Sequence, residues 1–241
     1  MRRSSTSGVA AIVPAAGAGR RLGGPGNKLF AALHGEPLLA HTLRALQASA
    51  SIRWIVPVVR MADRGRVQAL ATRFGITKAV APCVGGPTRA ESVARGLAAL
   101  PAAARWVLVH DGARPCLSPR LVDQAVRAAV RQGAVACGLP AALTVKAVDA
   151  RGEVRLTLDR DHLWLVQTPQ VFRRDWLTEA FARAERRLAQ FPDDAAVVEA
   201  AGYAVRMIPG DPLNLKVTTK ADLLFAEAVL AAARGNGRAA R

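Results

Sequence analysis

The sequence predicts an α/β fold with a mostly parallel sheet and helices on both of its faces. Short β-rich runs alternate with segments of helical spacing from residue 9 to residue 139. Several of these runs are apolar throughout, which is typical of strands buried on both faces. The chain has 241 residues, enough for one large domain or for one domain with an appendage.

The first elements follow each other closely. Residues 9–13 are a continuous apolar run and are predicted to form a strand. Residues 36–48 have helical spacing, with leucines on one side of the helix. Residues 52–59 are β-rich and form the next predicted strand. A helix over 62–74 and a short strand over 77–81 continue the alternation.

The alternation continues to residue 139. A helix is predicted over 89–100, and Pro101 ends it. Residues 106–110 read as a buried strand. Ser118, which precedes a proline, is a good N-cap for a further helix, and residues 134–139 form another strand.

The loops after the predicted strands mark the expected ligand site. In parallel sheets ligands bind beyond the carboxyl ends of the strands. The loops that follow Val13, Ala81, His110 and Leu139 all fall on that edge. We therefore expect the polar residues of these loops to lie close together.

The pattern changes after residue 140. Residues 143–148 and 154–158 are two short β-like runs with a turn-rich connection, so together they predict a hairpin. An isolated hairpin is marginally stable in water, so it is expected to pack on something, for example a second subunit.

Helices resume in the last third of the chain. They are predicted over 173–190, 193–201 and 219–234, with a strand over 204–208 between the last two. We expect residues 9–234 to form a single domain with the hairpin as an arm at about 141–165. Residues 1–8 are expected to be a flexible leader, and residues 235–241 a frayed tail.

Composition excludes several classes of protein. Apolar residues make up 51% of the chain, but no run is long enough to span a bilayer, and the N-terminus has no signal-peptide core. The chain has three cysteines and no CxxC pair, so neither a zinc site nor a disulfide framework is indicated. A reducing cytoplasm fits this cysteine usage best.

The formal net charge of +16 would suit a nucleic-acid-binding protein. The basic residues are mostly arginines spread over the whole chain, without a dense basic run or interleaved aromatic residues. We therefore interpret the charge as scattered and solvated, and we expect neither a nucleic-acid partner nor a membrane partner.

The loop after the first strand has the chemistry of a phosphate cradle. It reads PAAGAGRRL from Pro14 to Leu22, and Lys28 follows. Small residues let backbone amides approach a ligand, and the cations match a polyphosphate. A dinucleotide fingerprint needs a glycine at Leu22, and a Walker loop needs Ser or Thr after its lysine, so both are excluded. A glycine-rich turn with solvated arginines remains the alternative.

Three further loops carry polar residues. The stretch Gly85–Ser92 puts two glycines before a helix, which suits reading of a base edge by backbone groups, and it equally suits a plain capping box. Asp111 follows a buried strand, where an acid can hold a metal ion or ribose hydroxyls, although an Asp-Gly surface turn is the alternative. Lys216 lies between apolar residues and either reaches the same site or snorkels from a strand.

Taken together, these motifs resemble a known family. The set comprises PAAGxGxR with Lys28, GGxxRxxS at 85–92, VHDxARP at 109–115, QTPQ at 167–170 and NxKVT at 214–218. It resembles the 2-C-methyl-D-erythritol 4-phosphate cytidylyltransferases of the non-mevalonate isoprenoid pathway, over about residues 9–232. The resemblance implies a Rossmann-like nucleotidyltransferase fold with a protruding β-hairpin arm, CTP as donor, a divalent metal (normally Mg²⁺) and a homodimer.

The resemblance also implies a role for each matching residue. Backbone groups of Ala15, Ala16 and Gly17 would contact the nucleotide, and Gly86 and Ser92 would read cytosine. Arg21, Lys28 and Lys216 would stabilise charge on the triphosphate in the transition state. Asp111 would lie near ribose, metal and acceptor. Arg160 and Thr168 would come from the neighbouring subunit to the acceptor's phosphate, and Arg114 and Thr144 complete the substrate-binding set.

A few positions depart from the family pattern. Ala142 and Leu143 stand where an arginine and an aspartate are usual, Leu213 replaces an acid, and Pro87 replaces a polar residue. These changes touch the acceptor side more than the CTP side. The expected reaction is CMP transfer from CTP to 2-C-methyl-D-erythritol 4-phosphate. The alternatives are another polyol phosphate such as ribitol phosphate, and a basic nucleic-acid-binding protein on the same fold.

Overall fold

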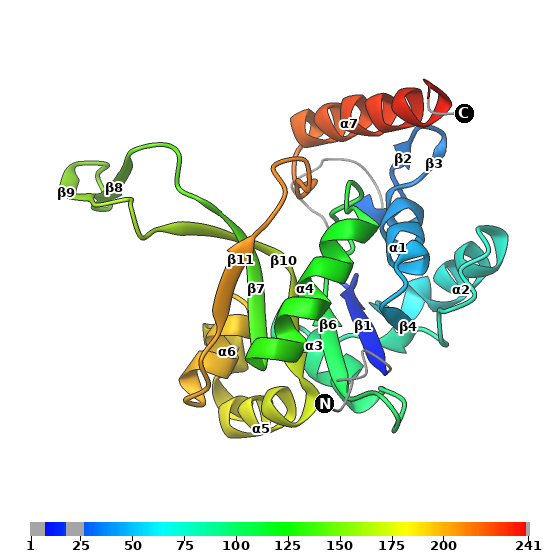
Figure 1. Ribbon diagram of the computed structural model, residues 1–241, viewed down its shortest axis with the longest axis horizontal. Helices are drawn as coiled ribbons and strands as arrows, with labels where there is room; N and C mark the ends of the chain where they lie inside the picture. Colours follow the sequence, from blue (N-terminus) through cyan, green and yellow to red (C-terminus); the bar gives the residue numbers. More distant parts are fainter. Residues whose placement is uncertain (1–7, 18–26, 240–241) are drawn as a thin grey trace.

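The computed structural model describes residues 8–17 and 27–239, with side chains as far as residue 233. Its centre is a seven-stranded sheet in the order β11-β7-β10-β6-β1-β4-β5 (Figure 1). The neighbouring strands pair in parallel, except that β10 is antiparallel to both β6 and β7. The strands are β1 (Val9–Pro14), β4 (Ile52–Val59), β5 (Cys83–Val84), β6 (Trp106–Val109), β7 (Ala134–Pro140), β10 (Trp164–Arg173) and β11 (Arg206–Pro209).

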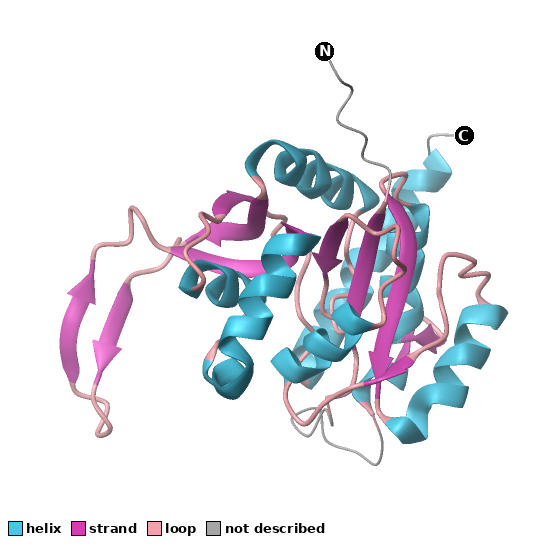
Figure 2. Cartoon of the chain, turned by 90° about the horizontal axis from the view of Figure 1, so that it is seen from below, coloured by secondary structure: helices cyan, strands magenta, loops and turns pink. Residues whose placement is uncertain are grey.

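Helices cover both faces of this sheet (Figure 2). One core cluster joins the sheet to α1 (Leu38–Ala48), α2 (Arg64–Arg73), α4 (Pro119–Gln132) and α7 (Lys220–Ala239). The other joins it to α3 (Arg89–Ala98), α5 (Arg174–Ala184) and α6 (Asp194–Ala200). The predicted α/β fold with a mostly parallel sheet is confirmed.

Strand β1 explains why the sheet is buried on both sides. Val9 and Ala11 pack into the first cluster, whereas Ala10 and Ile12 pack into the second. An apolar run without polar alternation is what such a central strand requires. On the second face α3 comes very close to the sheet, because a Cβ on Gly96 would lie 2.6 Å from Ile12 Cγ2. The turn before α3 lies beside the end of β1, since a Cβ on Gly85 would lie 2.5 Å from Ala16 Cβ.

Strand β10 was not predicted. It contains Pro169, which counts against a strand in a sequence reading, and its pairing is antiparallel. Gln170 pairs with Val109, and this register brings Thr168 next to the loop that follows β6. The strand therefore helps to build the site.

The prediction of a short strand over residues 77–81 was also wrong. Ala79 forms only an isolated bridge with Ile55, and the edge strand is β5, at Cys83–Val84. Residues 36–37 are β3 (Glu36–Pro37), which pairs with β2 (Ala32–Leu33), so α1 begins two residues later than predicted, at Leu38. Helix α7 continues to Ala239, beyond the expected end at 234.

The hairpin prediction is confirmed. Strands β8 (Val145–Val148) and β9 (Val154–Leu158) form a separate two-stranded sheet that extends away from the main sheet (Figure 1). All five residues of β9 are exposed. The arm therefore presents its side chains to solvent or to another molecule.

Candidate active site

A cavity of about 350 Å³ opens at the carboxyl ends of β1 and β6, as the loop positions predicted. It lies between the loop after β1, the N-terminus of α3, the loop after β6 and the segment that precedes α7. Its lining consists of Pro14, Ala15, Ala16, Gly17, Lys28, Leu29, Gly86, Pro87, Thr88, Arg89, Ser92, Asp111, Ala113, Lys216 and Thr218.

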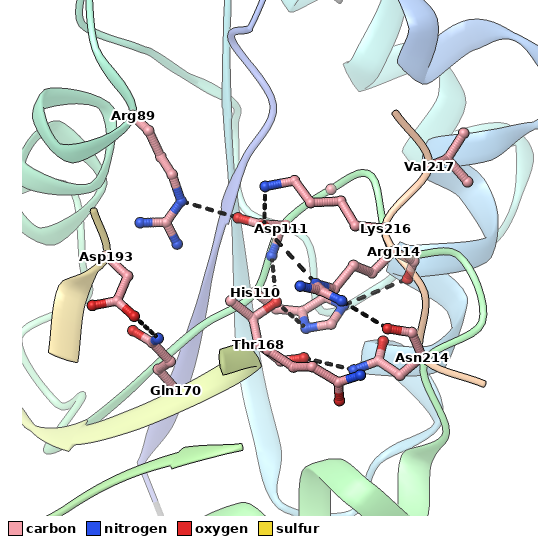
Figure 3. Close-up of polar contacts among 12 residues, drawn as sticks. Arg89, His110, Asp111, Arg114, Thr168, Gln170, Asp193, Asn214, Lys216 and Val217 are labelled. Atoms are coloured by element: carbon pink, nitrogen blue, oxygen red, sulfur yellow. Dashed lines mark hydrogen bonds and ion pairs between the residues drawn. The ribbon is translucent and has the colours of Figure 1, made fainter. Parts of the chain in front are cut away.

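Asp111 is surrounded by cations (Figure 3). Its Oδ1 accepts a hydrogen bond of 3.0 Å from Arg89 Nε, and its Oδ2 lies 2.7 Å from Lys216 Nζ. Arg114 Nε lies 3.9 Å from Oδ2. Burial by itself would raise the pKa of Asp111, but the charges of Arg89 and Lys216 outweigh it and hold that pKa well below its usual range. The carboxylate therefore stays ionised.

A buried polar layer supports Asp111 from below. Thr168 Oγ1 accepts the backbone N–H of Asp111 at 3.1 Å and lies 3.1 Å from His110 Nδ1. Because the threonine hydroxyl then donates to Nδ1, the imidazole proton belongs on Nε2, which faces the carbonyl of Arg114 at 3.5 Å. Burial, helped by the charge of Arg114, lowers the pKa of His110 to about 3. The histidine is therefore neutral and structural.

Asn214 joins this layer to the segment that carries Lys216. Its Nδ2 donates to the Thr168 carbonyl at 2.7 Å, and its own carbonyl accepts from Arg114 at 2.7 Å. Asn214 is 0% exposed. These bonds fix the loop two residues before Lys216, which is a loop lysine and not the snorkelling strand lysine of the alternative.

Lys28 reaches the cavity from the connection between β1 and α1. Its Nζ donates to the Val217 carbonyl at 2.8 Å, so it lies beside the Lys216 segment. A short 3-10 helix begins at Lys28, and the Asn27 side chain caps it by accepting from Leu29 N. Asn27 is in turn bonded to Asp63 at 3.0 Å, which ties this connection to the start of α2.

The opposite wall is the turn that leads into α3. Thr88 and Glu91 form the predicted capping box. Ser92 Oγ accepts from Gly86 N at 3.1 Å and donates to the Thr88 carbonyl at 2.9 Å. A Cβ on Gly86 would lie 2.5 Å from Glu91 Cβ, so a larger residue would clash with Glu91 at this position. The capping role and a role in reading a base edge are thus compatible.

The structure brings most of the predicted residues together. Those that line the cavity are Ala15, Ala16, Gly17, Lys28, Gly86, Ser92, Asp111 and Lys216. Arg114 and Thr168 lie behind this lining, where both are buried. Thr168 supports Asp111 within its own chain, and its expected contribution to a neighbouring subunit stays a prediction. Arg21 lies outside the described residues.

Thr144 and Arg160 lie on the arm, where both are exposed and neither lines the cavity. Arg160 donates to the Ala142 carbonyl at the base of the arm. The sequence reading missed Arg89, His110 and Asn214 as site residues. All three lay within the quoted motifs, and their positions beside the ends of strands or helices or next to Lys216 were the available signal.

Comparison with known proteins decides the family. Residues 9–232 match the model of the family described as 2-C-methyl-D-erythritol 4-phosphate cytidylyltransferase. The chain belongs to this family. It is 44% identical over 220 residues to the 2-C-methyl-D-erythritol 4-phosphate cytidylyltransferase of Synechococcus sp. (strain WH7803), covering 91% of this chain and 98% of the relative. The protein of the same name from Pelotomaculum thermopropionicum is 42% identical over 228 residues, covering 94% of this chain and 96% of the relative.

Solved structures agree with this membership. The 4-diphosphocytidyl-2C-methyl-D-erythritol synthase from Anaerococcus prevotii has a TM-score of 0.82 and 28% identity, covering 93% of this chain and 96% of that one. The cytidylyltransferase from Thermus thermophilus has a TM-score of 0.74 and 34% identity, covering 92% and 98%. The predicted nucleotidyltransferase fold is thus confirmed, and the chain is a cytidylyltransferase. The alternative readings as a ribitol phosphate enzyme or a nucleic-acid-binding protein are not favoured.

Within the described ranges, 8–17 and 27–239, no helix has the length and apolar character needed to cross a membrane.

Proposed function

We propose that this chain transfers CMP from CTP to the phosphate of 2-C-methyl-D-erythritol 4-phosphate, giving 4-diphosphocytidyl-2-C-methyl-D-erythritol and pyrophosphate. The observation that carries the proposal is the cavity wall where Lys28 and Lys216 lie on adjacent segments, opposite the glycine turn before α3. A triphosphate needs clustered cations, and a base needs a close backbone surface. This cavity offers both.

The reaction follows from the charges. A phosphate oxygen of the acceptor attacks the α-phosphorus of CTP, the new P–O bond forms, and the bond to the pyrophosphate oxygen breaks in line. A phosphate monoester is already anionic near neutral pH, so no general base is needed. Lys28 and Lys216 neutralise charge that develops on the α-phosphoryl and pyrophosphate oxygens, and Arg21 is assigned the same role.

The nucleotide is oriented by the other walls. Ala15, Ala16 and Gly17 line one side of the cavity, where their backbone groups would contact the phosphates. Gly86 and Ser92 line it at the turn before α3, where they would contact the base. Gly86 N already donates to Ser92 inside the turn, and the Gly86 carbonyl, which accepts from Ser92 at 3.3 Å, keeps a second lone pair for a bound base. Acceptors suit the amino group of cytosine better than the carbonyl of uracil.

Mg²⁺ is the divalent ion we propose for this site. Among the described residues there is no cluster of three or more His, Cys, Asp or Glu side chains able to hold a metal. Asp111 is nevertheless an ionised carboxylate at the cavity wall, and Mg²⁺ is commonly held by one or two carboxylates together with substrate phosphates. Asp111 would hold the ion with the triphosphate, and the bound ion would supply further neutralisation of charge.

A homodimer through the arm completes the proposal. The arm exposes large apolar side chains that the described part of the chain leaves uncovered: Leu143 (81% exposed), Val148 (55%), Val154 (57%) and Leu156 (54%). Apolar patches of this kind mark interaction surfaces. A second copy would cover them and would bring Thr144 and Arg160 to the neighbouring cavity. We assign this dimer to the cytoplasm, because three free cysteines suit a reducing compartment.

A pyrophosphate-release assay tests the function. Purified protein is incubated with CTP and Mg²⁺ together with 2-C-methyl-D-erythritol 4-phosphate, with ribitol 5-phosphate or without acceptor. We expect release only with the first acceptor. Equal or faster release with ribitol phosphate would transfer the assignment to that substrate, and no release with either would refute it.

A further inference from the structure

Asp194 is a completely buried carboxylate that pairs with Arg89 and does not itself line the cavity. It is the first residue of α6, it is 0% exposed, and its Oδ2 accepts a hydrogen bond of 2.9 Å from Arg89 Nη2. Its Oδ1 has no hydrogen-bond partner among the described residues. Burial raises the pKa of Asp194 above its usual range, and the charge and hydrogen bond of Arg89 oppose that rise. Arg89 is therefore the group that favours the ionised form of this buried carboxyl.

Arg89 needs carboxylate partners as much as Asp194 needs Arg89. It is the first residue of α3, where the helix dipole disfavours a positive charge. Burial would lower its pKa, but the charges of Asp194 and Asp111 outweigh burial and raise it. The guanidinium is therefore clamped between two carboxylates from different parts of the chain.

The clamp determines how Asp111 is held. Arg89 Nε donates to Oδ1 of Asp111, while Lys216 contacts Oδ2, so cations on two sides fix both carboxylate oxygens (Figure 3). Without Asp194, the long side chain of Arg89 loses its only other anchor among the described residues. Asp111 would then be fixed mainly from the side of Lys216.

We propose that Asp194 is a positioning residue for nucleotidyl transfer, which acts through Arg89 to hold Asp111 in its productive orientation. The inference rests on the proposed function, because Asp111 is assigned to the reacting groups there. A misplacement of about 1 Å at such a group costs up to about a hundredfold in rate. We expect the loss of orientation to lower kcat more than it changes KM, because orientation matters most in the transition state.

The test measures kcat and KM of Asp194→Asn, Arg89→Gln and the double variant in the pyrophosphate-release assay. The rate is divided by the concentration of CTP-binding sites, measured by titration calorimetry. A variant that is partly unfolded is then not mistaken for a slow enzyme. We expect Asp194→Asn to lower kcat about ten- to a hundredfold, with the KM for CTP changed less than about threefold. Because Asp194 acts only through Arg89, the double variant should be no slower than Arg89→Gln.

Asp193→Asn is the matched control. It removes the same charge one residue away, and asparagine can still cap α6, but Asp193 contacts Gln170 and Ala196 rather than Arg89. Its kcat should stay near wild type. If Asp194→Asn does not fold, Asp194→Glu, which keeps the carboxylate, replaces it and should retain most of the wild-type kcat per site.

Three results would overturn the inference: unchanged kcat per site in Asp194→Asn, multiplicative losses in the double variant, or a loss in Asp194→Glu as large as in Arg89→Gln. Failure of the proposed function is distinct, since the wild-type protein would then release no pyrophosphate.

Discussion

Single charges dominate the chemistry of this site. Lys28 is fixed at the cavity wall by its bond to the Val217 carbonyl, and Lys216 is fixed by Asp111. Each ammonium group is therefore held in place before the substrate binds. Preorganised charge of this kind stabilises a transition state more than mobile charge does, because little reorganisation is needed during the reaction.

Replacement of Lys28 by alanine tests this view. We expect Lys28→Ala to lower kcat by about a hundred- to a thousandfold, because a cation directed at the transition-state charge is lost. Lys220→Ala is the control, since Lys220 is exposed at the start of α7 and does not line the cavity. Steady-state kinetics would contradict the assignment if both variants turned over at the wild-type rate.

The buried His110 predicts a pH dependence of stability. Its pKa in the folded protein is about 3, below the ordinary value of 6.5, so the unfolded chain binds more protons between these values. The neutral His110 contributes fully to the free energy of unfolding above about pH 6.5. This contribution is lost as the pH falls toward 3, by up to about 1.4 kcal/mol per pH unit. Urea unfolding between pH 6.5 and 4.5 measures this slope. His110→Gln should flatten it, and an identical slope in both proteins would contradict the burial argument.

Among the described elements, the arm carries the proposed dimer contact. A variant that replaces residues 143–158 with a short Gly-Ser linker should be monomeric and should lose transfer to the acceptor, because Arg160 and Thr144 could no longer reach a neighbouring cavity. Light scattering and the kinetic assay measure the two effects.

Arg160→Ala serves as the control for the arm deletion. It keeps the apolar residues of the arm, so it should remain dimeric while acceptor transfer falls. A monomeric wild-type protein would exclude the arm as a dimer contact.

The elements also show what the sequence can predict. Strands such as β1 and β6 were predictable because their apolar runs reflect burial on both faces. Strand β10 was not, because its antiparallel place between β6 and β7 depends on tertiary pairing and its local signal is weakened by Pro169. The edge strand β5 was misplaced for the same reason, since only its register with β4 selects it.

The same distinction holds for the site. Asp111 and Lys28 were predictable because each follows a strand in a recognisable motif. The link from Arg89 to Asp194 was not, because it joins residues 105 positions apart, and no local pattern indicates which buried carboxylate an arginine will meet. The contact of Thr168 with Asp111 was not predicted, because it depends on the register of β10.

The molecule as a whole carries a net charge of +16. Ligand-induced shifts of the melting temperature test whether this charge binds nucleic acid. If the arginines are simply solvated, CTP with Mg²⁺ should raise the melting temperature clearly, ATP less, and duplex DNA hardly at all. A CTP concentration of about a hundredfold above its dissociation constant stabilises the folded protein by about 2.7 kcal/mol. A larger shift with DNA, falling steeply with added salt, would instead indicate a nucleic-acid-binding surface.

The most direct test of the account follows the phosphorus atoms. Phosphorus NMR of CTP, Mg²⁺ and 2-C-methyl-D-erythritol 4-phosphate with the enzyme reports which P–O bond breaks. Attack at the α-phosphorus predicts equal amounts of pyrophosphate and of a product with two coupled diphosphate signals, with loss of the acceptor's monoester signal. Accumulation of CDP or orthophosphate, or of CMP with an unchanged acceptor signal, would contradict cytidylyl transfer by this cavity.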